Sequence, residues 1–169
     1  QSSLAPVAVP FIDDLSAKVG ETVHLAELDN GQVLYVDKRN PASPIEMYSQ
    51  AGKVGPAYCT GVGKAMMAFL DESELNKVIS KQAFHKYTEH TITSAKALKK
   101  ELATIKKEGI SFDRQEHEEK IICISSPILT SGGKVIGGLS ITSSIDIHSL
   151  NSLEKFKPEL LETSELIGK

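Results

Sequence analysis

Cys123 is the residue whose type could perform covalent chemistry, and it stands in the isoleucine-rich run Ile121–Ser125. A cysteine nucleophile needs a neighbouring base and an electropositive environment that lowers the pKa of its thiol. No histidine stands at a spacing that ties it to Cys123. A buried, inert thiol is therefore the favoured interpretation, and a cysteine-dependent enzyme is the alternative.

Two hydroxyl residues, Ser140 and Thr142, share one face of the predicted strand GGLSITSS, because side chains alternate along a strand. Gly137 and Gly138 precede them and leave room for another group to approach the backbone. Hydroxyls placed in this way either meet solvent or line a polar pocket. The residues by themselves leave both possibilities open.

The run Gly61–Lys64 has parts of a phosphate-binding loop but completes neither known pattern. The Walker pattern needs glycine where Tyr58 stands and a hydroxyl residue where Ala65 stands. The dinucleotide pattern GxGxxG needs a third glycine at the position of Met66. What remains is a glycine-rich helix start, which offers N–H groups to a small anion or permits close packing.

The acidic run Glu116–Glu119 includes His117 but is not the zinc motif HExxH, because Ile121 occupies the place of the second histidine. We predict a solvated charged turn there and no metal site. Asp113, which comes shortly before this run, has the residue type of a turn former, and its position alone assigns it no other role.

Composition indicates one cytoplasmic domain that neither spans a membrane nor grips nucleic acid by itself. The chain has 169 residues, 40 % of them hydrophobic, and a formal net charge of −3. No apolar run approaches the length of a membrane span, and the acidic balance is unlike that of a DNA-binding surface. The two cysteines stand far apart in the sequence, which favours reduced thiols.

The first half of the chain predicts a helix followed by a hairpin. Apolar spacing and a terminal Gly20 place the helix near residues 10–19. Asn30-Gly31 between alternating apolar runs predicts a tight turn that joins strands near residues 22–28 and 32–38. A short strand is expected near residues 45–48.

The second half predicts three helices, another hairpin and a last helix. Thr60, Asp71 and Ser94 are placed as helix caps, and Gly109 as the end of the third helix. Strands are expected over Ile121–Ser125 and Val135–Thr142, and a final helix from Leu150 to Ile167, kinked or broken unless Pro158 lies in its first turn. This order predicts an α+β fold, in which an antiparallel sheet has helices packed against it.

Two stretches, MYSQAGKVGPAYCTGVGKAMMAFL and GISFDRQEHEEKIICISSPILTSGGKVIGGLSIT, resemble the C-terminal effector domain of IclR-type bacterial transcription regulators. GETVHLAELDNGQVLYVDK also fits, so the resemblance covers nearly the whole chain. It implies a GAF-like curved antiparallel sheet that holds a small-molecule pocket. Residues 1–169 would then form one ligand-sensing, oligomerising domain without catalytic residues, metal or cofactor.

The resemblance also implies which residues touch the ligand. In family members that bind small carboxylates, the contacts come from the helix start, an aspartate, a cysteine and two strand hydroxyls. Carried over to this chain, with an apolar wall added, the ligand-binding residues are Met47, Gly61, Val62, Asp113, Cys123, Ser140 and Thr142. Val62 is bulkier than the alanine often found there, and Thr142 replaces a serine.

The implied partners are a small organic acid, DNA and further copies of the chain. The segment IEMYSQAGKVGPAYCTGVGK resembles regulators of sugar-acid catabolism, so a sugar acid or 2-oxo acid is expected. DNA binding would belong to a winged helix-turn-helix outside this chain, and the assembly would be a dimer or tetramer. A GAF-like cyclic-nucleotide sensor is disfavoured, because only 5 % of the residues are aromatic and none is tryptophan.

Overall fold

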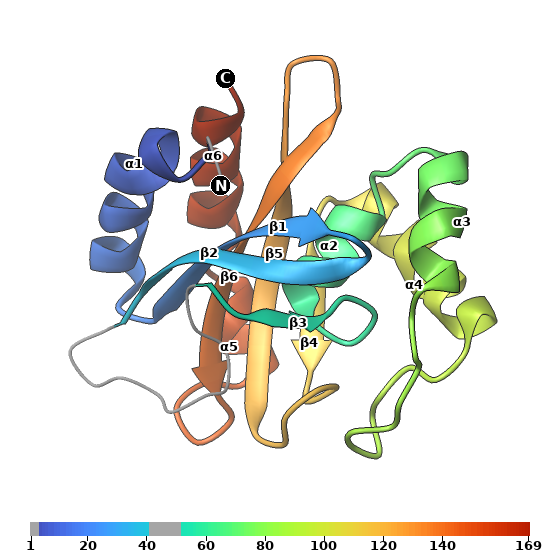
Figure 1. The fold of residues 1–169 in the computed structure, drawn as a ribbon. Coiled ribbons are helices and arrows are strands. Elements are labelled where there is room, and N and C mark those ends of the chain that lie inside the picture. Colours follow the sequence, from blue (N-terminus) through green and yellow to red (C-terminus); the bar gives the residue numbers. More distant parts are fainter. Residues whose placement is uncertain (1–3, 41–51) are drawn as a thin grey trace.

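The computed structural model describes residues 4–40 and 52–169. Its elements, in chain order, are α1 Leu4–Val19, β1 Thr22–Asp29, β2 Gln32–Arg39, β3 Val54–Pro56, α2 Gly61–Met67, α3 Glu72–Ser80, α4 Ala95–Glu108, β4 Ser111–Arg114, β5 Ile121–Leu129, β6 Val135–Ser144, α5 Leu150–Glu154 and α6 Lys157–Gly168 (Figure 1). Within these ranges, the helices are all too short or too polar to cross a membrane.

The strands form one six-stranded sheet in the order β3-β2-β1-β6-β5-β4, and every neighbouring pair is antiparallel. The first hairpin turns at Asn30 and Gly31, whose φ angles of 52° and 82° suit a two-residue turn. The sheet curls, with helices on both faces (Figure 1). The predicted α+β fold with a curved antiparallel sheet is confirmed.

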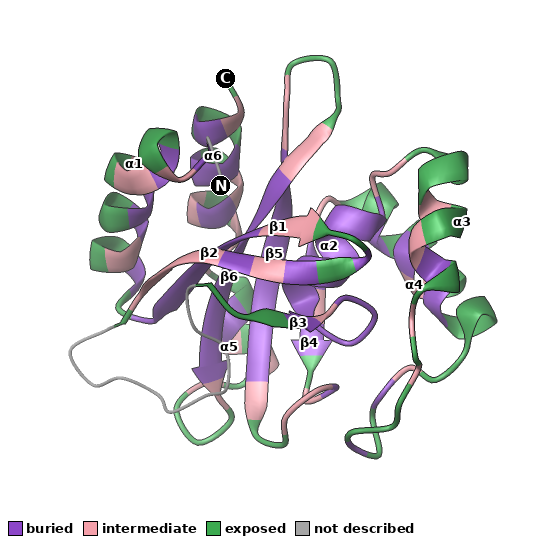
Figure 2. Ribbon diagram, viewed as in Figure 1, coloured by how far each residue is buried: buried purple, intermediate pink, exposed green. Residues whose placement is uncertain are grey.

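Helices on the two faces of the sheet divide the interior into two cores, and buried residues line the inner sides of both layers (Figure 2). On one face α1, α5 and α6 contribute residues such as Ile12 and Leu160. On the other face α2, α3 and α4 contribute Met66, Ile79 and Leu98. Period-two alternation sends successive strand residues to opposite layers.

The predicted caps are present. The side chains of Thr60, Asp71 and Ser94 each accept a hydrogen bond from the backbone N–H three residues later. Gly109 ends α4 with a φ of 81°, a conformation that glycine adopts without strain. These contacts fix where α2, α3 and α4 begin, and α2 is the helix that borders the site described below.

Several boundaries differ from the prediction. The first helix begins at Leu4 rather than near residue 10, because Leu4 and Ala8 continue its buried stripe past Pro10. The last helix is broken into α5 and α6, one of the predicted outcomes, and Pro158 lies in the first turn of α6, where its missing N–H costs no hydrogen bond. The short edge strands β3 and β4 were not predicted. The strand expected near residues 45–48 lies outside the described residues, as does Met47.

Glycines let α2 lie directly against the sheet. A Cβ on Gly138 would come within 2.6 Å of Val62 Cγ2, and a Cβ on Gly61 within 2.8 Å of Ser125 Oγ. A Cβ on Gly63 would lie 2.4 Å from the backbone oxygen of Ala57. The packing role that the sequence left open for these glycines is therefore present, and it leaves α2 almost no space to shift.

Candidate functional site

A cavity of about 30 Å³ lies between the start of α2 and the polar face of the sheet. By volume it has room for about two water molecules. Every described residue of the expected ligand-binding set lines it, namely Gly61, Val62, Asp113, Cys123, Ser140 and Thr142. These residues come from α2, β4, β5 and β6, so the fold brings together side chains that are far apart in the sequence.

Further lining residues were not identified from the sequence. His24 and Tyr35 come from the first hairpin, and the cavity is completed by Gly55, Thr60, His117, Glu118 and Ile121. His24 lies opposite Ser140 in the pairing of β1 with β6. The pairing of β1 with β6 is what places His24 at the site. It joins residues more than a hundred positions apart in the sequence, and hairpin patterns do not predict pairing over such a separation.

Polar side chains form a connected row across the strands. Cys123 Sγ lies 3.1 Å from Thr142 Oγ1, which lies 3.3 Å from Ser140 Oγ and 3.4 Å from His24 Nδ1. Because hydroxyl groups both donate and accept, this row can reorganise around a ligand hydroxyl or carbonyl. The row is a polar surface with no fixed charge.

The thiol and imidazole of this row are not poised for nucleophilic catalysis. Burial, helped by Asp113, raises the pKa of the Cys123 thiol. Burial, helped by the charge of Lys38, lowers the pKa of His24 to about 3, so its ring is neutral. Cys123 therefore behaves as the buried thiol that its sequence position favoured, and the cysteine-enzyme alternative has no activated group.

The start of α2 supplies backbone donors. Thr60 caps the helix, its Oγ1 accepting from Gly63 N at 3.3 Å and donating to Pro56 O at 2.7 Å. The N–H groups of Gly61 and Val62 belong to the first turn, which has no intrahelical acceptors for them. Both residues line the cavity.

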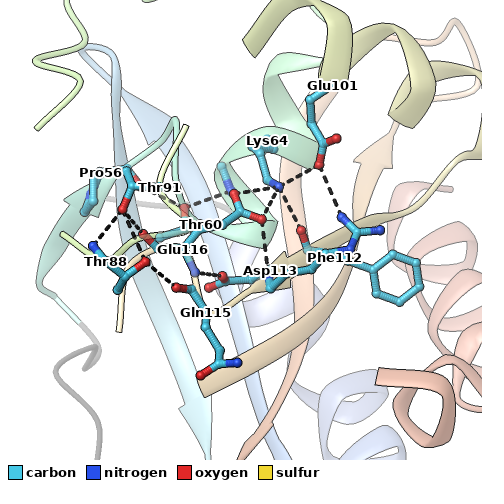
Figure 3. A network of polar contacts seen from close by, with 12 residues as sticks. Pro56, Thr60, Lys64, Thr88, Thr91, Glu101, Phe112, Asp113, Gln115 and Glu116 are labelled. Atoms are coloured by element: carbon cyan, nitrogen blue, oxygen red, sulfur yellow. Dashed lines mark hydrogen bonds and ion pairs between the residues drawn. The ribbon is translucent and has the colours of Figure 1, made fainter. Parts of the chain in front are cut away.

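A buried ion network is centred on Lys64 of α2 (Figure 3). The Lys64 side chain is 0 % exposed, and its Nζ donates to Glu101 at 2.9 Å, to Phe112 O at 2.8 Å and to Glu116 at 2.9 Å. Burial lowers the pKa of Lys64, but the carboxylates of Glu116 and Glu101 raise it more, so the amine stays charged. All three ammonium protons are used.

The network reaches the cavity through Asp113. Its Oδ1 accepts from Glu116 N at 2.8 Å, and Arg114 N donates to Glu116 Oε2 at 3.2 Å. Burial, together with the negative charge of Glu116, raises the pKa of Asp113 to about 8. Asp113 is thus mostly protonated at neutral pH, which makes it a donor as well as an acceptor.

The acidic run that was expected to be a solvated turn is partly buried. Glu116 is only 4 % exposed and pairs with Lys64, because the turn folds back under α2. No three metal-ligating side chains gather anywhere in the ranges that the structure describes. The prediction of a solvated turn was wrong for Glu116, while Glu119 and Lys120 are exposed.

Lys64→Met should destabilise the fold by about 3–5 kcal/mol, because it leaves the Glu116 carboxylate buried without its partner. Adding Glu116→Gln should recover part of that loss. Glu101→Gln should cost less, since the Glu101 side chain is 25 % exposed. Urea unfolding of the three variants and the wild type measures this, and a Lys64→Met stability equal to wild type would contradict it.

Asp113→Asn should change how stability depends on pH. A folded-state pKa near 8, against 3.8 for the unfolded chain, means that the wild type loses stability as pH rises between these values. The asparagine variant keeps the acceptor and has no carboxyl proton to lose at this position. The free energy of unfolding of the variant minus that of the wild type should therefore grow from pH 4 to about pH 8 and then level off. Thermal unfolding across this pH range measures the difference, with Asp14→Asn, at an exposed position, as control. A stability difference that stays constant with pH would contradict the raised pKa of Asp113.

The comparisons with known proteins agree on the family. The model of the bacterial transcriptional regulator IclR C-terminal domain matches residues 1–169. The HTH-type transcriptional regulator KdgR of Dickeya chrysanthemi is 36 % identical over 129 residues, which is 76 % of this chain and 42 % of KdgR. The chain spans about half the length of such curated relatives.

Solved structures give the same result for the fold. IclR of Thermotoga maritima superposes with a TM-score of 0.93 at 31 % identity, covering 99 % of this chain and 68 % of that one. The inducer-binding domain of a PobR double mutant from Acinetobacter, in complex with 3-hydroxybenzoic acid, has a TM-score of 0.87 at 24 % identity and shares the fold over 99 % of both chains. The chain belongs to the IclR family of bacterial transcriptional regulators, as its C-terminal effector-binding domain.

Proposed function

We propose that this domain binds a small organic acid in the cavity beside α2 and thereby controls how the whole regulator binds DNA. The observation that carries the proposal is the convergence on one cavity of six residues expected from the sequence to touch a ligand. They supply backbone N–H groups on one side and hydroxyls on the other. An acid with an oxo or hydroxyl group near its carboxylate matches that arrangement.

The electrostatics of the cavity support a carboxylate held by hydrogen bonds rather than by an ion pair. No lysine or arginine is among the described residues that line it. The N–H groups of Gly61 and Val62 donate to the carboxylate at the positive end of α2, and charge-assisted hydrogen bonds of this kind are strong. Asp113, with its pKa of about 8, donates its proton instead of repelling the anion.

Two arguments favour the chemical class of the effector. The sequence resembles regulators of sugar-acid catabolism, which favours a sugar acid or a 2-oxo acid. The PobR domain, which shares this fold, holds 3-hydroxybenzoic acid, a hydroxylated carboxylate. A thermal-shift screen of sugar acids, 2-oxo acids and hydroxybenzoates, with cyclic nucleotides as an outgroup, identifies the ligand.

The domain acts in the cytoplasm as part of a larger, symmetric assembly. DNA is bound by a winged helix-turn-helix outside this chain, and the effector shifts the equilibrium between two conformations by its different affinity for them. The effector domain joins copies of the regulator, because bacterial regulators read paired half-sites as symmetric oligomers.

The isolated domain is expected to form dimers or tetramers and to leave duplex DNA unshifted. Its net charge of −3 provides no net electrostatic attraction to the phosphates of DNA. Light scattering measures the mass and a gel shift at physiological ionic strength measures DNA binding. A monomer at high concentration would refute the first expectation, and a specific shift would refute the second.

Ser140→Ala and Thr142→Val should each weaken effector binding about 5- to 150-fold, because removing one buried hydrogen-bond partner costs about 1–3 kcal/mol. Cys123→Ser should be milder, since a hydroxyl replaces a thiol of similar size. Calorimetry with the acid found by the screen measures all three affinities.

Ser143→Ala is the matched control, because Ser143 is buried on the same strand but faces the other layer and has no hydrogen-bond partner. It should bind the acid as wild type does. If Ser140→Ala and Thr142→Val fold normally and also bind like wild type, the effector site lies elsewhere.

A further inference from the structure

Two hollows of very different size share a wall. The cavity of about 30 Å³ adjoins a groove of about 570 Å³, and Gly55, His117 and Glu118 line both. The groove also contacts Tyr58, Lys81 and Tyr87. Small-molecule sites usually enclose roughly 300–1,000 Å³. The cavity alone is far below that range, and the groove lies within it.

An occupant larger than a few atoms therefore has to displace one wall of the cavity, and most of the walls that the described residues form are fixed. Ser140, Thr142, Cys123 and His24 stand on strands that are paired on both sides. The start of α2 is pressed against the sheet at Gly61, where even an added Cβ would meet Ser125 Oγ. Neither wall can retreat without breaking the sheet or its packing.

The wall toward the groove has two parts, Gly55 on β3, which is paired with β2, and the tip of the turn between β4 and β5. The tip is the part that differs from the fixed walls. The base of this turn is anchored (Figure 3). Thr88 Oγ1 donates to Gln115 O at 2.6 Å, Thr91 Oγ1 donates to Glu116 O at 2.6 Å, and Glu116 is held by Lys64. At the other end Lys120 N donates to the Gln115 side chain at 2.8 Å.

The tip itself is more exposed than its base. His117 and Glu118 are partly exposed, whereas Glu116 is buried. The His117 and Tyr87 rings meet edge-on with centroids 4.6 Å apart, and Tyr87, which is 46 % exposed, lines the groove. The base is held by several short hydrogen bonds, whereas the partly exposed tip has one longer backbone bond, from Ile121 N to Glu118 O at 3.3 Å. A firmly held base with such a tip is the geometry of a movable partition.

We propose that the groove is the outer compartment of the effector site, and that His117 and Glu118 form the partition through which the effector reaches the inner cavity. This proposal rests on the proposed function. The carboxylate lies inward against α2, and the polar remainder of a longer acid extends past the displaced tip into the groove. The side chains of His117 and Glu118 thus set the length of acid that the domain accepts.

The reaction of Cys123 with iodoacetamide tests the partition without any effector. Cys123 lines the inner cavity, so the rate of its alkylation reports how readily the reagent enters that cavity. Cys59 is 0 % exposed and does not line the cavity, so its alkylation reports opening of the whole domain. Mass spectrometry of tryptic peptides follows both rates in the same sample.

The comparison is between His117→Ala/Glu118→Ala and Glu118→Gln. The charge of Glu118 contributes to the raised pKa of the Cys123 thiol, so removing it speeds alkylation even without opening. Glu118→Gln removes the charge but keeps the size of the side chain, so it measures how much of the faster alkylation comes from the charge alone. The double variant should alkylate Cys123 about tenfold faster than Glu118→Gln, the factor that corresponds to about 1.4 kcal/mol of lost closing free energy.

Tyr87→Ala, which removes the ring that holds His117, should also speed alkylation of Cys123 and leave Cys59 unchanged. Equal rates in the double variant and Glu118→Gln would overturn the proposal, as would equal acceleration of both cysteines. A failed effector screen with the expected alkylation pattern would refute the proposed ligand and leave the partition standing. Effector binding without the expected alkylation rates would refute the partition and leave the proposed ligand standing.

Discussion

The burial of the Lys64 ammonium is the constraint on which the rest of the site depends. A charge removed from water requires a full set of acceptors, and a helix, a strand and a turn supply them through Glu101, Phe112 and Glu116. A buried ion network of this kind adds little net stability compared with apolar packing, because desolvation offsets the Coulomb attraction. Its effect is geometric: α2, α4 and the turn after β4 have one relative position in which the charge is satisfied.

That position determines the chemistry of the cavity. The turn that brings Glu116 to Lys64 also places Asp113 in the cavity, and the negative charge of Glu116 helps to keep Asp113 protonated. The same turn continues into His117 and Glu118, which separate cavity from groove. One structural requirement therefore determines both the protonation of Asp113, which lines the cavity, and the position of the turn that carries His117 and Glu118.

The sequence predicted the features that are determined locally and missed those that depend on distant pairing. The hairpin at Asn30-Gly31 and the caps at Thr60 and Ser94 follow from short-range rules, and the structure confirms them. The edge strands β3 and β4 have three and four residues, too few for a periodic signal. His24 joins the site only because β1 pairs with β6.

The ion network was missed for the same reason. In the sequence, Lys64 belongs to an incomplete phosphate-loop pattern, and Glu116 belongs to a charged run that predicts a solvated turn. Their pairing spans 52 positions in the sequence, and Glu101 adds a partner 37 positions away. No local pattern shows that a charged residue is buried. The six cavity residues were reached through a resemblance to a family, which carries tertiary information that spacing lacks.

The small volume of the cavity is consistent with the task of a sensor, which is to bind its ligand more tightly in one conformation than in the other. A ligand changes a conformational equilibrium only by the difference between its affinities for the two states. A preformed pocket that fits the effector in both states produces no such difference, however tightly it binds. A cavity with room for about two waters makes the proposed effector bind the displaced arrangement of His117 and Glu118 and reject the closed one. The free energy spent on moving that tip lowers the affinity and is what couples occupancy to conformation.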